Sequence, residues 1–293
     1  MQRIKIGVVG LGGIGGLIAI LFKRKRYEVF SNKNTKEKFI SMKLSSTYYG
    51  NLAETIQIDK TLGKADIIFI CSKFPYLKKN LNNINNKKAL VISFLNGLSH
   101  FDILKNKFSN NKTYISNIGK VVSKKNQKKI AHASNNKPEV LLSSQNKNKD
   151  KIKFIYNLLK KINFKVKIVN SNTDVIWNKL IRLSAVSAIT SLYNCNFGQI
   201  KKSKKRSSEL EDLVKEGLYL AKTLFNYSKN YVSTMKEINR FPNNLSTSMQ
   251  RDINSKIYTK SEIKTQIGAI YKLAVINNIE LTATNRIYKL LIK

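Results

Sequence analysis

A glycine-rich turn near the start of the chain has the spacing that binds phosphate groups. Its pattern is GxGxxG, in which Gly10 permits a sharp bend, Gly12 lets the backbone approach a pyrophosphate, and Gly15 lets a helix pack closely on a strand. Free N–H groups at the start of that helix favour a bound diphosphate. The residues that this pattern predicts to bind a dinucleotide are Gly10, Leu11, Gly12, Gly13, Ile14 and Gly15.

The segments on either side of the turn support the same interpretation. Arg3–Val9 is rich in β-branched residues and predicts a strand, and the apolar Gly16–Phe22 is compatible with a helix. A signal anchor is the alternative, because the uncharged run Ile6–Phe22 has basic residues on both sides. Six glycines and a length below about 20 residues argue against a membrane-spanning helix. A chance cluster of glycines is the remaining alternative.

The end of the next predicted strand, Tyr27–Ser31, indicates which dinucleotide is bound. An NAD site places Asp or Glu there to bond the ribose 2′-hydroxyl. This chain has Ser31 and Lys33 instead, with Asn32 between them, and these groups suit a 2′-phosphate. The sequence therefore favours NADPH, with Ser31 and Lys33 as cofactor-binding residues, unless Lys33 is simply one more exposed lysine.

Two further buried strands, Ala65–Ser72 and Ala89–Leu95, are followed by polar side chains. Ligands bind outside the carboxyl ends of strands in open α/β sheets, and Lys73 and Asn96 occupy those positions. We expect both residues beside the cofactor and Asn96 beside the substrate as well. A simple Asn-Gly turn is the alternative for Asn96-Gly97.

The remaining pattern predicts an α/β fold with two domains. The N-terminal Rossmann-like dinucleotide-binding domain covers residues 1–170, and an all-helical C-terminal domain, carrying substrate and catalytic residues, covers 171–293. Further strands and helices of the first domain are expected at Thr113–Ile118, Val140–Ser143, Phe164–Val169, Leu77–Ile84 and Lys151–Ile162. Polar loops are expected at Lys124–Lys129 and Gln145–Lys149. Helices of the second domain are expected at Asp174–Tyr193, Ser207–Asn226, Val232–Asn239, Ser246–Asn254, Thr259–Asn277 and Ala283–Ile292. Thr173 or Asp174 is expected to cap the first of them.

Composition excludes several classes of protein. The 293 residues are 42% hydrophobic, enough for a folded core rather than a disordered chain. Two cysteines cannot hold a disulfide-rich scaffold together. Two histidines without a CxxC pair argue against a zinc or His-cluster metalloenzyme, so no metal is expected. We expect a cytoplasmic protein.

The chain is strongly basic, with 54 Lys and Arg against 17 Asp and Glu and a formal net charge of +37. The charge is mostly lysine and is spread along the chain, whereas a nucleic-acid site concentrates arginine and aromatic residues. We expect a solvated surface that binds no specific nucleic acid and attracts small phosphorylated or carboxylated molecules.

Four segments together resemble the ketopantoate reductase (2-dehydropantoate 2-reductase) family over nearly the whole chain. They are Gly7–Gly16, the segments around Lys73 and Asn96, Trp177-Asn178-Lys179-Leu180, and Leu245–Ile253 with Ser261–Gly268. The resemblance implies NADPH-dependent reduction of ketopantoate to pantoate, in pantothenate and coenzyme A synthesis. It also implies a small 2-keto acid as the substrate. We expect no membrane partner and assembly as a homodimer.

The resemblance also implies roles for single residues. Lys179 and Glu262 would be the catalytic residues. Lys179 would bond the keto oxygen and donate a proton as the hydride arrives, and Glu262 would also bind the substrate through its distal hydroxyl. Ser248 would hold the substrate carboxylate, and Asn96 would lie near the nicotinamide and the substrate. Each residue also has a purely structural alternative. Lys179 could be an ordinary solvated lysine, Glu262 an acidic residue that stabilises the first turn of a helix, and Ser248 a local helix cap.

The chain departs from the family pattern in ways that bear on the substrate. Leu183 and Ser187 stand where the family has asparagines, four and eight residues after Lys179, and only Ser187 can still bond a substrate. The interval before Glu262 is two residues longer than usual, which places Lys260 at the unshifted position. A related enzyme for another 2-keto acid, a non-catalytic NADP(H)-binding module, a nucleic-acid binder and a membrane-anchored protein are the alternatives.

Overall fold

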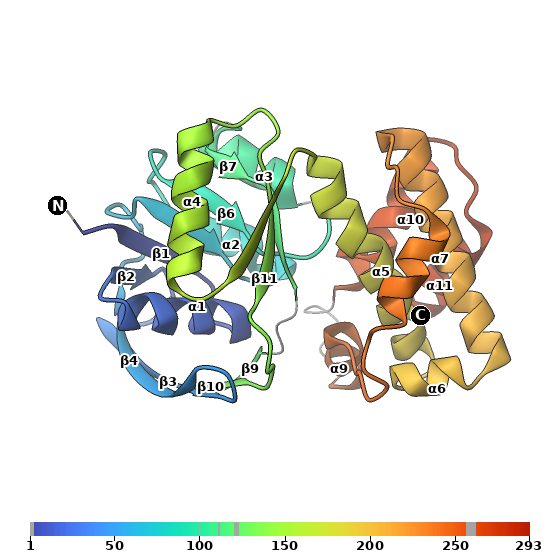
Figure 1. Ribbon diagram of the computed structural model, residues 1–293, viewed down its shortest axis with the longest axis horizontal. Coiled ribbons are helices and arrows are strands. Elements are labelled where there is room, and N and C mark those ends of the chain that lie inside the picture. The colour runs from blue at the N-terminus through green and yellow to red at the C-terminus, as the bar shows by residue number, and fades with distance from the viewer. Residues whose placement is uncertain (1–2, 99, 111, 120–122, 256–261) are drawn as a thin grey trace. The chain divides into compact units, whose positions relative to one another are not determined.

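Two structural units make up the chain in the computed structural model, which describes residues 3–98, 100–110, 112–119, 123–255 and 262–293. One unit consists of Met1–Leu95 with His100–Val175, and the other of Asn96–Ser99 with Ile176–Lys293. The first is an α/β unit and the second is built from helices, so the α/β class with a helical C-terminal half is confirmed (Figure 1).

A sheet of nine strands, counted over the described residues, forms the centre of the α/β unit in the order β7-β6-β5-β1-β2-β4-β3-β10-β9. Strands β1, β2, β4, β5, β6 and β7 run parallel to one another, while β3 and β9 pair antiparallel with β4 and β10. The strands are β1 Lys5–Val9, β2 Glu28–Ser31, β3 Phe39–Ser46, β4 Gly50–Ile58, β5 Ile67–Ile70, β6 Leu90–Ser93, β7 Thr113–Tyr114, β9 Ser123–Asn126 and β10 Lys129–His132.

The central strands are buried on both faces, which explains their nearly unbroken apolar sequences. Ile6 and Val8 of β1 belong to a core that includes side chains of α1 (Gly13–Arg24) and α4 (Lys149–Lys161). Val9 belongs to a second core with α2 (Leu77–Leu81) and α3 (His100–Phe108). Successive side chains of a strand point to opposite faces, so helices cover both sides of the sheet.

The uncharged run at the start of the chain is not one continuous helix. It forms β1, a turn and α1, as the dinucleotide-binding pattern predicts and the signal-anchor alternative does not. Among the described residues, none of the helices combines the length and the apolar character needed to cross a bilayer.

The prediction of a polar loop at Lys124–Lys129 is wrong, because most of this stretch lies in the strands β9 and β10. Strand β10 alternates between exposed and buried residues, and Ile130 packs against the α1 helix, where a Cβ on Gly16 would lie 2.6 Å from its Cδ1 atom. The neighbouring strands β3 and β4, which the sequence pattern did not predict, extend the sheet to this edge. In β3 and β10 every second residue is buried, which is enough to attach these strands to the sheet.

Within the described ranges, three strands form a second, small sheet in the order β12-β11-β8. They are β8 Ser116–Gly119, β11 Glu139–Ser143 and β12 Lys165–Val169. The single strand predicted over Thr113–Ile118 is therefore divided between two sheets, β7 in the large one and β8 in the small one. The loop predicted at Gln145–Lys149 ends at Asn148, whose side chain caps α4 by accepting a hydrogen bond from the Lys151 N–H at 3.0 Å.

Helices follow one another after β12, as predicted. They are α5 Asn172–Leu192, α6 Phe197–Lys201, α7 Lys204–Phe225, α8 Tyr231–Ile238, α9 Ser248–Asn254, α10 Ile267–Ile276 and α11 Thr282–Ile292, with a 3-10 helix η3 at Ile263–Thr265. The fifth predicted helix, Thr259–Asn277, begins outside the described residues and is interrupted at Gln266 between η3 and α10. The predicted cap of the first helix is wrong: the Ser171 hydroxyl, one residue before α5, accepts from the Asp174 N–H at 3.0 Å.

Candidate active site

The glycine turn of the α/β unit has the backbone that its sequence predicts. Gly10 has a φ of +89°, which favours glycine, and a Cβ there would lie 2.7 Å from the Ser72 backbone. A Cβ on Gly15 would lie 2.0 Å from the Gly10 carbonyl oxygen. Both glycines are therefore required by the close packing of the turn, β5 and the start of α1.

Gly12 differs from these two glycines, because no described atom beyond its own chain neighbours lies within 4 Å of where its Cβ would be. Its φ of −79° and ψ of −160° are open to any residue, and it precedes α1 at the N-cap position without a side chain to cap the helix. Neither conformation nor protein packing requires glycine here. Open space beside a helix N-terminus fits a diphosphate that approaches the backbone closely.

The end of β2 is more buried than the sequence alone indicates. Ser31 is fully buried, and no described residue forms a hydrogen bond with its hydroxyl. The amide of Asn32 donates to the Asn80 carbonyl oxygen, and Lys33 is half-buried. Of the two residues predicted to bind a 2′-phosphate, Lys33 therefore has the more accessible side chain. Lys73 follows β5 and precedes the 3-10 helix Phe74–Tyr76, with a partly exposed side chain.

A buried carboxylate, Glu262, lies at the centre of the polar residues in the helical unit. The Asn96 amide donates to both of its oxygens at 3.3 Å, and the Ser248 hydroxyl donates to Oε2 at 3.0 Å. Gln266, which the sequence pattern did not single out, donates its Nε2 to Oε2 at 2.8 Å. Three residues predicted from the sequence thus meet in one hydrogen-bonded group, although 166 positions separate Asn96 from Glu262.

Close packing at Gly97 brings Asn96 to the Glu262 carboxylate. Gly97 has a φ of +89°, and a Cβ there would lie 2.2 Å from the Thr265 carbonyl oxygen. Only glycine lets this turn lie so close to η3, which begins directly after Glu262. The Asn96-Gly97 dipeptide therefore forms a turn, and this turn also positions the Asn96 amide to donate to the Glu262 carboxylate.

Ser248 is positioned by the start of α9. The neighbouring Thr247, not Ser248, is the cap of that helix, since its hydroxyl accepts from the Gln250 N–H at 3.3 Å. The Thr247 hydroxyl also lies 3.0 Å from that of Thr190 on α5. Because Thr247 performs the capping, the Ser248 hydroxyl is left to donate to Glu262.

Lys179 lies on α5, two residues after the fully buried Trp177, which packs into the helical core and against the Phe225 ring at 5.3 Å. Burial lowers the pKa of Lys179 to about 8; the Glu262 carboxylate opposes this shift, and the positive charge of Arg182 adds to it. An ammonium group with this pKa releases a proton much more readily than an ordinary lysine. Lys179 is half-buried, whereas composition alone would favour a fully solvated lysine.

Arg182 is a second residue that sequence reasoning missed. Its Nε donates to the Asn178 carbonyl oxygen at 2.7 Å and lies 3.2 Å from Glu237, which also pairs with Lys229 at 2.6 Å. The spacing of three residues from Lys179 on one helix is the signal that could have revealed its influence, because such residues are neighbours on a helix surface.

The two departures from the family pattern lie on the same helix. Leu183 is partly exposed, one turn after Lys179, whereas Ser187 is only 2% exposed. No hydrogen bond among the described residues joins the Ser187 side chain to the Glu262 group. Its role in substrate binding stays a prediction.

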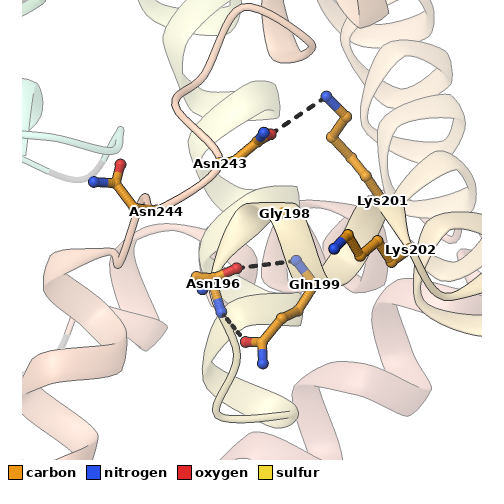
Figure 2. A pocket seen from close by; sticks show the side chains of 7 residues that line it. All are labelled: Asn196, Gly198, Gln199, Lys201, Lys202, Asn243 and Asn244. Carbon is orange, nitrogen blue, oxygen red and sulfur yellow. Dashed lines mark hydrogen bonds between the residues drawn. The ribbon is translucent and has the colours of Figure 1, made fainter.

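A separate surface pocket of about 400 Å³ lies on the helical unit and contains none of the predicted site residues (Figure 2). Asn196 and Gln199 bond each other's backbone N–H groups at 2.9 Å, and Asn243 accepts from Lys201 at 3.5 Å. Its polar groups are thus largely engaged with one another. No cluster of metal-ligating side chains is found within the described part of the chain either.

Two models of a known protein family match this chain. Residues 6–143 match the family model "Ketopantoate reductase PanE/ApbA", and residues 173–293 match its C-terminal counterpart, "Ketopantoate reductase PanE/ApbA C terminal". A search of curated protein sequences found no match.

Solved structures with the same fold include a D-mandelate dehydrogenase with NADH and anilino(oxo)acetate (TM-score 0.86, 15% identity, 98% of this chain and 97% of that chain). A dimeric ketopantoate reductase from Staphylococcus aureus has a TM-score of 0.79 at 18% identity, with the same coverage. A 2-dehydropantoate 2-reductase from Geobacter metallireducens GS-15 has a TM-score of 0.85 at 14% identity and covers 98% and 99% of the two chains. From the two family models, which together match most of its length, the chain belongs to the ketopantoate reductase family.

Proposed function

We propose that this protein reduces ketopantoate to pantoate with NADPH, a reaction of pantothenate and coenzyme A synthesis. The observation that carries this proposal is the polar group of the helical unit. It combines Lys179, whose pKa is lowered to about 8, with a carboxylate that accepts hydrogen bonds from Asn96 and Ser248. A ketone reduction needs a proton donor of this kind, because alkoxide character develops on the oxygen.

The residues proposed to hold the cofactor are Gly10, Leu11, Gly12, Gly13, Ile14, Gly15, Ser31, Lys33, Lys73 and Asn96. The open space at Gly12 supports the diphosphate position, and the absence of Asp or Glu from residues 31–36 supports the 2′-phosphate. NADH is the alternative, since the structurally similar D-mandelate dehydrogenase was solved with it. When bound, the reduced nicotinamide supplies a hydride to the keto carbon.

The chain's own residues supply the proton and the orientation. The Lys179 ammonium group bonds the keto oxygen and gives it a proton, which yields the alcohol and a neutral amine that regains its proton from water. When the substrate binds, the Ser248 hydroxyl turns from Glu262 to donate to the substrate carboxylate. Asn96 bonds the reacting end, and Glu262, still held by Gln266, accepts from the distal hydroxyl. Ser187 is proposed as a further substrate-binding residue on α5.

The test is NADPH oxidation with ketopantoate, followed for the wild type, Lys179→Ala and the exposed-lysine control Lys272→Ala. General acid catalysis contributes about 10²–10⁴-fold, so Lys179→Ala should lower kcat by at least about 100-fold while Lys272→Ala leaves it unchanged. Equal activity of Lys179→Ala and the wild type would contradict the proposal.

Leu183 favours a second candidate, a related reductase of another 2-keto acid. Its partly exposed apolar side chain, one turn from Lys179, suits a substrate with an apolar group, and the similar D-mandelate dehydrogenase was solved with anilino(oxo)acetate. Turnover of such acids but not of ketopantoate would select this candidate. Saturable NADPH binding without turnover of any 2-keto acid would select a non-catalytic module instead.

The proposed assembly is a homodimer, because one structural neighbour is described as dimeric. Light scattering of the eluted protein should give twice the chain mass of 33.5 kDa. Cys71 and Cys195 are both free thiols, which suits a reducing compartment such as the cytoplasm.

A further inference from the structure

Gln266 is an unusual residue to find buried in the helical unit. Its side chain is 1% exposed, although glutamine is mostly exposed in folded proteins. It occupies the break between η3 and α10, where its φ of −106° and ψ of −98° interrupt the helical backbone. A leucine or methionine would fill such a position without burying polar atoms, so the amide needs another explanation.

The amide of Gln266 makes the shortest hydrogen bond to the Glu262 carboxylate. Its Nε2 atom lies 2.8 Å from Oε2, compared with 3.0 Å for the Ser248 hydroxyl and 3.3 Å for the Asn96 amide. The Gln266 N–H also donates to the Glu262 carbonyl oxygen at 3.0 Å. Gln266 therefore holds both the backbone and the side chain of Glu262.

The oxygen of the Gln266 side-chain amide shows that the Glu262 carboxylate sets the orientation of this amide. No described residue donates to the buried Oε1 atom of Gln266. Leaving a buried acceptor unpaired is unfavourable, and a reversed amide would instead point that oxygen at the Glu262 carboxylate, which is worse. The orientation that places the amide donor on Glu262 is therefore the favoured one.

The two oxygens of Glu262 are consequently unequal. Among the described residues, Oε2 accepts from Ser248, Gln266 and Asn96, whereas Oε1 accepts from Asn96 alone. Each carboxylate oxygen has about two lone-pair positions, so only Oε1 retains capacity for another donor.

We propose that Gln266 is a positioning residue that anchors Oε2 of Glu262 and so keeps Oε1 available to a hydroxyl group of the substrate. This inference rests on the proposed function, which supplies a substrate with such a hydroxyl. Gln266 itself touches no reacting atom. Gln266 instead affects substrate specificity, that is, the preference for substrates that carry the hydroxyl over substrates that lack it.

The test compares ketopantoate with 3,3-dimethyl-2-oxobutanoate, which differs only in lacking that hydroxyl. The kcat/KM preference for ketopantoate should fall about tenfold or more in Gln266→Met, since hydrogen bonds to charged groups are the stronger ones. Gln250→Met is the matched control: Gln250 is also buried, but it bonds Asn194 and Ser246 rather than Glu262. That variant should keep the wild-type preference.

Crystal structures of the wild type and Gln266→Met provide a measurement that does not depend on turnover. The Glu262 carboxylate should rotate or occupy several positions in the variant, while Ser248 and Asn96 stay in place. An unmoved carboxylate, or an unchanged substrate preference in an active variant, would overturn the inference. Gln266→Leu is the second variant if the first does not fold. A wild type that reduces neither acid would refute the proposed function, and the structures would still decide the role of Gln266.

Discussion

At the scale of single residues, the proton affinity of Lys179 depends on burial and on two nearby charges of opposite sign. Burial lowers its pKa to about 8, the Glu262 carboxylate raises it, and Arg182 lowers it. The proposed reaction needs the protonated ammonium group. The fraction of enzyme that carries this proton falls as the pH rises through the pKa, so kcat/KM for reduction should decline above about pH 8.

Arg182→Gln should move this decline to higher pH. Removing a positive charge stabilises the protonated form of Lys179 and therefore raises its pKa. Measuring kcat/KM between pH 6 and 10 checks the direction of the shift. Arg240→Gln is the control, because Arg240 is an exposed arginine that is not among the charges acting on Lys179. A decline that stays in place or moves to lower pH in Arg182→Gln would refute this account.

At the scale of elements, the glycine turn contains two glycines that the fold requires, Gly10 and Gly15. Its third glycine, Gly12, is not required by the fold and is available to bind a ligand. Gly15→Ala puts a methyl group 2.0 Å from a carbonyl oxygen, and overpacking of this kind destabilises by about 1–3 kcal/mol or more. Gly12→Ala meets no described atom within 4 Å. Gly12→Ala should therefore keep a melting temperature close to that of the wild type while its Kd for NADPH rises at least about tenfold. Calorimetry measures both quantities, and unchanged affinity in Gly12→Ala would exclude a diphosphate at this turn.

The start of α5 offers a second test at this scale. Ser171→Ala removes the side chain that caps the helix and should lower the free energy of unfolding by about 0.5–2 kcal/mol. Thr173→Ala, at one of the two positions that the sequence predicted as the cap, should be nearly neutral. Urea unfolding of both variants checks the assignment. Equal losses would show that Ser171 has no special role.

At the scale of the whole molecule, the net charge of +37 should strengthen the binding of anionic ligands at low salt. Screening by salt weakens such attraction, so the Kd for NADPH should rise between 50 and 500 mM KCl. The rise should be steeper for NADPH than for NADH because NADPH carries an additional phosphate. Fluorescence titration of both cofactors measures the two slopes. Parallel slopes would mean that the 2′-phosphate meets no positive charge.

Much of the fold follows from local sequence patterns, and the exceptions have a physical cause. Strands buried on both faces, such as β1 and β5, are continuous apolar runs and were predicted correctly. Strands β3 and β10, near one edge of the sheet, bury only every second residue. Their sequences therefore lack the continuous apolar run from which the buried strands were predicted. The cap at Ser171 was missed because a helix boundary depends on one hydrogen bond that neighbouring hydroxyl groups could equally make.

The sequence by itself determined the glycine turn and the helical second half, which depend on residue type and spacing within short segments. Its resemblance to the ketopantoate reductase family indicated Lys179, Asn96, Ser248 and Glu262 as candidates. Only the tertiary structure decided that Asn96, Ser248 and Gln266 donate to one carboxylate, and that burial brings the pKa of Lys179 near 8. Hydrogen-bond partners and desolvation come from chain segments far apart in sequence, and packing alone brings those segments together.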